Sequence, residues 1–223
     1  MDEHAVALRS ARGIALIALP VLLFATMLAA FSVSVAWLGR ERGYLIGFAF
    51  YWLFWCLLVP RLFLGGRCFA SILASRVPLF TWANAPAALL FAMVTVTAAT
   101  LYASGFVHAP WLTIVVAAPF AVIDGICEEI LWRGLYVRMF AGRPLLAIIY
   151  SALGYAVWHF VPQMDFPSSS GAVPFVASTF CLGLTYGFIA YRTGTARWTA
   201  VSHSFNGFLA LGGHLGSALL TLL

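Results

Sequence analysis

The 223-residue chain contains no lysine and few charged residues of any kind, 9% in all. Soluble globular proteins carry about 25% charged residues, so this composition excludes an ordinary soluble domain. Hydrophobic residues make up 63% of the chain, and its mean hydropathy is +0.99. The composition predicts an all-α fold, a polytopic transmembrane helical bundle in contact with the lipid bilayer.

All twelve basic residues are arginines, and they give a formal net charge of +5. They lie mostly between apolar runs rather than in one basic patch, so they indicate membrane topology, and no nucleic-acid partner is expected. Basic residues that are all arginine suggest a GC-rich coding sequence and hence a bacterium. The expected location is the cell membrane, as a multi-pass protein of the bacterial inner membrane.

Cysteine is scarce, and no CxxC pair occurs. This spacing suggests neither a disulfide framework nor a zinc knuckle. The four cysteines are Cys56, Cys68, Cys127 and Cys181.

Apolar runs of about 20 residues, enough to cross a hydrocarbon core about 30 Å thick, recur along the chain. They predict about seven spans, within a range of six to eight, in a single integral-membrane domain over residues 1–223. The expected spans are residues 13–38, 43–64, 84–106, 111–140, 145–161, 173–191 and 198–222. Pro119 and Gly125 are expected to break the 111–140 run. Residues 68–79 are expected to lie along the membrane surface.

With seven spans, almost all arginines fall at one end of the bundle. The positive-inside rule predicts that this end faces the cytoplasm. Arg40 and Arg42 are exceptions, only partly offset by Glu41.

The sequence Glu128-Glu129-Ile-Leu-Trp-Arg133 places three charged residues inside an apolar run. Each costs roughly 2.5–3.5 kcal/mol at membrane depth, so the cluster indicates a functional site. Glu129 and Arg133 have the i,i+4 spacing of an ion pair. Glu128 has no local cation, and such a carboxyl group in low dielectric suits general acid/base chemistry on water. The alternative interpretation is that all three charges only hold helices together.

His159 and His203 are the next polar residues inside apolar runs. A single membrane histidine more often forms an interhelical hydrogen bond, but two beside paired glutamates favour catalysis. His203 and Asn206 are i and i+3 on one helix face, where both could donate to one oxyanion. Asp124 shares the face of Glu128 and is expected to tune that glutamate.

Two further histidines, His108 and His214, are expected to be structural or interfacial. His159 and His203 can act together only if they lie at a similar depth in the membrane. At about 1.5 Å per residue, the predicted span limits place His159 roughly 21 Å and His203 roughly 8 Å from the cytoplasmic side. The two could share one water only if the last helix began near residue 193, tilted, or were broken.

These motifs, in this order, resemble the CAAX protease and bacteriocin-processing family of glutamic-type intramembrane endopeptidases, relatives of the type II CAAX prenyl proteases. The resemblance covers a core at about residues 117–211. The matching residues are Glu128-Glu129-x-x-x-Arg133, Tyr155-x-x-x-His159, and a segment from Gly183 to Gly194 that leads to His203 and Asn206.

The resemblance implies a helical fold with a cavity open to the bilayer, no metal or cofactor, and hydrolysis of a peptide bond in a membrane-associated peptide or protein. The substrate would carry a CAAX-like tail, a C-terminal sorting signal or a leader peptide. Glu128 would activate water with help from His159, and His203 with Asn206 would stabilise the oxyanion. The implied supporting residues are Glu129, Arg133, Asp124 and Tyr155.

Two positions depart from the family pattern. Tyr155 stands where phenylalanine is common, and Asn206 follows His203 by three residues instead of four, the fourth position being Gly207. Both spacings reach the same helix face.

Other functions remain open. A zinc-dependent membrane hydrolase could use Glu128 or Glu129 with His159 and His203, although the HExxH helix is absent. A non-catalytic membrane binding protein, such as a bacteriocin-immunity protein, and a proton-relay transporter are further alternatives. A metal assay would separate the zinc enzyme from the metal-free protease.

Overall fold

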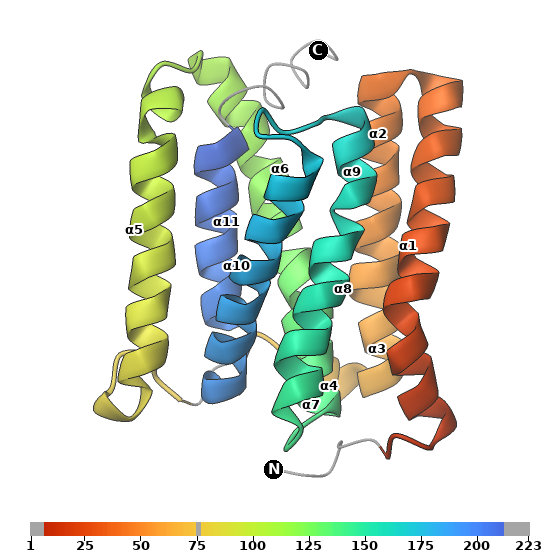
Figure 1. The fold of residues 1–223 in the computed structure, drawn as a ribbon, viewed down its shortest axis with the longest axis vertical. Helices are drawn as coiled ribbons and strands as arrows, with labels where there is room; N and C mark the ends of the chain where they lie inside the picture. The colour runs from red at the N-terminus through yellow and green to blue at the C-terminus, as the bar shows by residue number, and fades with distance from the viewer. Residues whose placement is uncertain (1–6, 75–76, 212–223) are drawn as a thin grey trace.

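The computed structural model describes residues 7–74 and 77–211, apart from the side chains of Phe106 and Leu211. The described residues form helices joined by short connections and contain no strand, which confirms the predicted all-α bundle (Figure 1). His214 and the last part of the predicted span 198–222 lie outside the described residues.

Several passes through the bundle are built from more than one helical segment. The elements are α1 (Ala11–Leu38), α2 (Arg40–Phe50), η1 (Tyr51–Leu58), α3 (Val59–Leu64), α4 (Gly66–Ala70), η2 (Trp82–Asn84), α5 (Ala85–Val107), α6 (Trp111–Glu129), η3 (Ile130–Leu135), α7 (Tyr136–Met139), η4 (Leu145–Tyr150), α8 (Ser151–Trp158), α9 (Phe160–Asp165), α10 (Ala172–Thr193) and α11 (Arg197–Leu211). η1, η3 and η4 are π-helical segments within longer helices, and η2 is a short 3₁₀ helix.

Five helical stretches are long and apolar enough to cross a membrane, so the chain is an integral membrane protein. They are Ala11–Leu38, Arg40–Leu64, Trp82–Gly105, Leu145–Asp165 and Ala172–Thr193. The stretch α6–η3–α7 carries the charged cluster, and α11 has only 15 described residues. With these two, the described chain passes through the bundle seven times, in agreement with the prediction of about seven spans (Figure 1).

Successive passes run in opposite directions, so α3, α7 and α10 all finish at the end where α1 begins (Figure 1). We call this the arginine-rich end, because it holds the described arginines Arg9, Arg12, Arg61, Arg67, Arg138, Arg143, Arg192 and Arg197. The positive-inside rule predicts that it faces the cytoplasm. The opposite, arginine-poor end is where α1 meets α2 and where α6 and α10 begin.

Arg40 and Arg42 lie at the arginine-poor end, and Arg40 has a structural role there. Its Nε donates to the backbone oxygen of Asp165 at 2.7 Å, and its guanidinium lies 4.5 Å from the centre of the Phe166 ring. This arginine therefore ties the start of α2 to the end of α9.

Residues 68–79, expected to lie along the membrane surface, include the end of the short helix α4, Gly66–Ala70. One local prediction is wrong. α6 continues through Pro119 and Gly125 without a break. At Gly125 the missing side chain serves helix packing, because a Cβ there would lie 2.6 Å from the backbone nitrogen of Ser204 on α11.

The connection between α4 and α5 sets the depth at which α11 begins. The backbone oxygen of Ile72 accepts hydrogen bonds from the backbone nitrogen of Ala196 at 3.2 Å and from Oγ1 of Thr195 at 2.9 Å. Ile72 also packs on Gly134, where a Cβ would lie 2.5 Å from the isoleucine side chain. α11 therefore begins level with η3, well inside the arginine-rich end.

A second close contact sets the depth of α8. A Cβ on Gly154 would lie 2.7 Å from the side chain of Trp132, so α8 and η3 face each other there. The two helices are antiparallel. His159, which follows Gly154, therefore lies on the same side of this contact as Glu128, which precedes Trp132. The expected separation of His159 from His203 is therefore wrong: it assumed that all helices begin at the same depth.

The contact at Gly125 generates a stability prediction. We expect Gly125→Ala to lower the free energy of unfolding by about 1–3 kcal/mol, because the added Cβ would press on the backbone of α11. The matched control is Gly105→Ala on α5, where a Cβ would meet nothing within 4 Å. Thermal unfolding in detergent measures both, and an equal midpoint for the two variants would contradict the close packing.

Candidate active site

The Glu128 carboxyl group is buried, with 1% of its surface exposed. Its Oε1 accepts hydrogen bonds from Nε1 of Trp158 at 2.7 Å and from the Tyr51 hydroxyl at 3.0 Å. The Tyr51 oxygen in turn accepts a hydrogen bond from Nε1 of Trp132 at 2.9 Å. The two direct donors, with Trp132 bonded to the Tyr51 oxygen, fix one oxygen of the carboxyl group.

Aromatic packing holds the donors in place. The Tyr51 and Trp158 rings are stacked, with centroids 4.1 Å apart, and Phe31 packs edge-on against Trp158 at 6.0 Å. π-helical segments adjoin both sides of the contact: η1 begins at Tyr51 and η3 begins directly after Glu129. Such segments are rare and occur frequently at functional sites.

The second oxygen of Glu128, Oε2, is buried and has no hydrogen-bond partner among the described residues. It lies 3.6 Å from Nε2 of His203 and 4.0 Å from Nε2 of His159. Both separations exceed a normal hydrogen bond and suit a bridging water. The predicted residues Glu128, His159 and His203 therefore meet around one carboxylate oxygen.

The other ring nitrogens determine which tautomers the histidines adopt. Nδ1 of His159 lies 2.7 Å from the backbone oxygen of Tyr155, and Nδ1 of His203 lies 3.0 Å from Oε1 of Glu129. A carbonyl or carboxylate oxygen can only accept, so each Nδ1 carries the hydrogen. In the neutral rings both Nε2 atoms are therefore proton acceptors that face Glu128.

The predicted ion pair between Glu129 and Arg133 is present. Nη1 of Arg133 lies 2.8 Å from Oε1 of Glu129, and neither side chain is more than 1% exposed. The guanidinium also lies over the ring of Tyr155, 4.3 Å from its centre. The same Glu129 oxygen contacts His203, so this pair orients a histidine as well as neutralising a charge.

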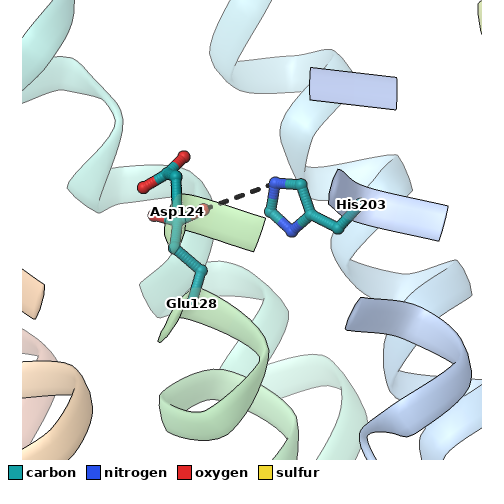
Figure 2. A group of neighbouring side chains, drawn as sticks. All are labelled: Asp124, Glu128 and His203. Atoms are coloured by element: carbon teal, nitrogen blue, oxygen red, sulfur yellow. Dashed lines mark ion pairs between the residues drawn. The ribbon is translucent and has the colours of Figure 1, made fainter. Parts of the chain in front are cut away.

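Asp124 lies beside Glu128, and both carboxyl groups face His203 from α6 (Figure 2). Its Oδ1 accepts a hydrogen bond from Nε1 of Trp52 at 2.8 Å. Asp124, Glu128 and His203 each offer one ligand atom, and these atoms lie within 4.8 Å of one another. Zinc–nitrogen and zinc–oxygen bonds are about 2.0–2.2 Å, so small side-chain shifts would let these donors hold a zinc ion.

Asn206 makes its contacts away from Glu128. Its Nδ2 donates to the Tyr186 hydroxyl at 2.9 Å and lies 3.4 Å from Oγ of Ser202. Gly207, at the position where the family pattern has asparagine, faces Ala121, whose Cβ lies 3.6 Å from an added Cβ. The oxyanion role of Asn206 stays a prediction.

Sequence reasoning missed the donors to Glu128, Tyr51 and Trp158, and the tryptophans behind them. The available signals were weak: Trp158 directly precedes His159, and Trp132 lies inside the charged motif. Nothing in the sequence linked Tyr51 to residues more than seventy positions away.

His108 lies in the connection after α5, where its Nδ1 is 2.6 Å from the backbone oxygen of Ser104.

Comparisons with known proteins support the same region of the chain. Residues 110–209 match the model of the family described as type II CAAX prenyl endopeptidase Rce1-like. This match confirms the family resemblance found in the sequence, and it covers α6 to α11, from which most of the site is built. No curated protein and no solved structure matches the chain.

The buried pair generates a prediction of its own. We expect Arg133→Met to lower the free energy of unfolding by about 3–5 kcal/mol, because it leaves the Glu129 charge buried without its cation. The double variant Glu129→Gln/Arg133→Met removes both charges and should recover part of the loss. Thermal unfolding in detergent measures both effects. A double variant as unstable as the single one would show that charge compensation is not the cause.

Proposed function

We propose that this chain, with its Rce1-like region at residues 110–209, is an intramembrane endopeptidase that hydrolyses a peptide bond in a membrane-associated substrate. The observation that carries the proposal is the state of the Glu128 carboxyl group. One oxygen is fixed by two donors, while the other is buried, unpartnered and faces two histidine nitrogens. Oε2 of Glu129 is also buried without a partner, so the feature that distinguishes Glu128 is the pair of histidine nitrogens beside its free oxygen.

Glu128 acts as the general base in the proposed reaction. A water bound to Oε2 gives a proton to the carboxylate as the resulting hydroxide attacks the substrate carbonyl. Nε2 of His159, an acceptor in the neutral ring, accepts a hydrogen bond from the second hydrogen of this water, which stays on the oxygen, and so orients the water. The proton on Glu128 then passes to the amine that leaves when the peptide bond breaks.

His203 stabilises the oxyanion. Its Nδ1–H is already donated to Glu129, so Nε2 can donate to an oxyanion only when the ring is an imidazolium. The Glu129 carboxylate beside it stabilises that positive charge, and Arg133 balances Glu129 in turn. This arrangement gives Glu129 a positioning role and leaves the proton transfer to Glu128.

The substrate is a membrane-associated peptide or protein, with a CAAX-like tail, a C-terminal sorting signal or a leader peptide as the cleaved segment. The location that we propose is the cell membrane of a bacterium. The family description names prenyl endopeptidases, and the seven passes place the site inside the bilayer.

Cleavage of a tail-bearing membrane substrate tests the mechanism. We expect Glu128→Gln to lower kcat by about 100-fold or more, because the amide cannot accept a proton from water. Glu41→Gln, the same chemical change on α2, is the matched control and should keep wild-type kcat. Equal rates for wild type and Glu128→Gln would overturn the assignment of the base.

The cluster of Asp124, Glu128 and His203 favours one alternative, a zinc-dependent membrane hydrolase. The same assay separates the two when each protein is treated with a strong chelator. Activity that survives chelation supports the metal-free reaction. Activity that is lost and then restored by added zinc would establish the zinc enzyme instead.

The two predicted oxyanion donors can be separated by substitution. We expect His203→Ala to lower kcat by about 100-fold or more, as for the loss of an oxyanion donor. Asn206→Ala should cost less, because the amide is already bonded to Tyr186 and Ser202. Steady-state kinetics on one substrate measures both. An equal loss for Asn206→Ala would place that amide on the oxyanion after all.

A further inference from the structure

Burial along α6 and its continuation changes abruptly at the active site. Every residue from 127 to 137 is buried, on all faces of the helix. On the other side of Glu128, toward the arginine-poor end, the same helix has exposed residues on each turn. Val115 is 55%, Val122 45% and Ile123 44% exposed.

α11 shows the same change at the same depth. Residues Thr199, Ala200 and Ser202 in its first part are buried, as are Thr195 and Ala196 just before the helix. From His203 to Ala210 no residue is buried.

α10 shows the same change in burial with depth, but in the reverse order along the chain from α11, because α10 begins at the arginine-poor end. Between 172 and 182 only Val176 and Thr179 are buried. The second half holds the remaining buried residues, Gly183, Tyr186, Gly187, Ile189, Ala190 and Thr193. On these three helices, the described residues toward the arginine-rich end form a packed half and those toward the arginine-poor end a more open half, while Tyr44, Phe48 and Phe120 are buried on the arginine-poor side of Glu128.

The packed half closes the site toward the arginine-rich end. Trp132 is 0%, Arg133 1% and Tyr155 1% exposed, and these large side chains lie directly beyond Glu128. A peptide entering from that side would have to separate the buried ion pair from its aromatic neighbours.

Glu128 itself leans the other way. Side chains on a helix tilt toward its N-terminus, and α6 begins at the arginine-poor end. The two histidines beside Glu128 are partly exposed, 13% for His159 and 12% for His203. The reactive groups therefore lie where the packed half meets the open half.

We propose that the substrate reaches Glu128 from the arginine-poor end, which the positive-inside rule places outside the cytoplasm. The substrate class is then a membrane-inserted or membrane-proximal segment of an exported protein, cut after the protein has crossed the bilayer. A prenylated tail on the cytoplasmic face would meet the packed half instead. The substrate assignment rests on the proposed peptidase function, while the direction of access does not.

Two positions on α11 test the direction of access without requiring catalysis. Thr199 and Gly207 lie four residues before and four residues after His203, on the same helix face. Thr199 is fully buried, and a Cβ on Gly207 would have ordinary contact distances. Each is changed to cysteine in a background with Cys56, Cys68, Cys127 and Cys181 replaced by alanine, with folding checked by size exclusion in detergent.

Labelling with a membrane-impermeant maleimide is then compared from the two sides, in spheroplasts and in inverted vesicles. Arg67→Cys and Ser169→Cys, both at exposed positions, mark the arginine-rich and arginine-poor ends. We expect Gly207→Cys to react at least about tenfold faster from the side on which Ser169→Cys reacts, and Thr199→Cys to react from neither. Faster reaction of Gly207→Cys from the Arg67 side, or from neither side, would overturn the proposal.

Cleavage assays complete the test with two substrates, one carrying its cleavable segment on the Ser169 side and the other a prenylated tail on the Arg67 side. Cleavage of the first substrate alone is the expected result. Cleavage of the second alone would overturn the substrate assignment. If neither is cut although Gly207→Cys labels from the Ser169 side, the peptidase function fails and the direction of access stands.

Discussion

Burying three charged side chains at membrane depth is the constraint on which the rest of the structure depends. Glu128, Glu129 and Arg133 are each at most 1% exposed. One arginine can neutralise only one of the two glutamates, and an uncompensated charge in low dielectric is expensive. Glu129 takes the cation, so the other carboxyl group relies on neutral donors from two further helices, Tyr51 on η1 and Trp158 on α8. The charge requirement thus draws three passes of the chain together.

Fixed contacts around Glu128 hold the groups of the proposed reaction in place. Stacked aromatic rings fix the donors to Glu128, and the ion pair fixes the ring of His203 through Glu129. Catalytic groups held in this way need little rearrangement when charge develops during a reaction.

Much of the fold and the central residues of the site could be predicted from the sequence, since both follow from local patterns. Apolar length gave the helices, and i,i+4 spacing gave the pair of Glu129 and Arg133. Relative depth could not be predicted, because it depends on tertiary contacts such as the hydrogen bonds to Ile72. For the same reason Tyr51 escaped notice. Its partner lies on another helix, and no spacing rule joins the two. The family pattern indicated Asn206, whose contacts lie elsewhere in the structure.

The π-helical segment η3 begins at Ile130, directly after the two glutamates. A π-helix bonds i to i+5 and so holds one more residue in a turn than an α-helix. If the same residues formed a regular α-helix instead, the extra residue would rotate everything before it by about 100° relative to the residues after it. Glu128 would then face away from Trp158 and Tyr51 although every motif residue was still present. The direction of the Glu128 carboxyl group therefore depends on the π-helical turn as much as on residue identity.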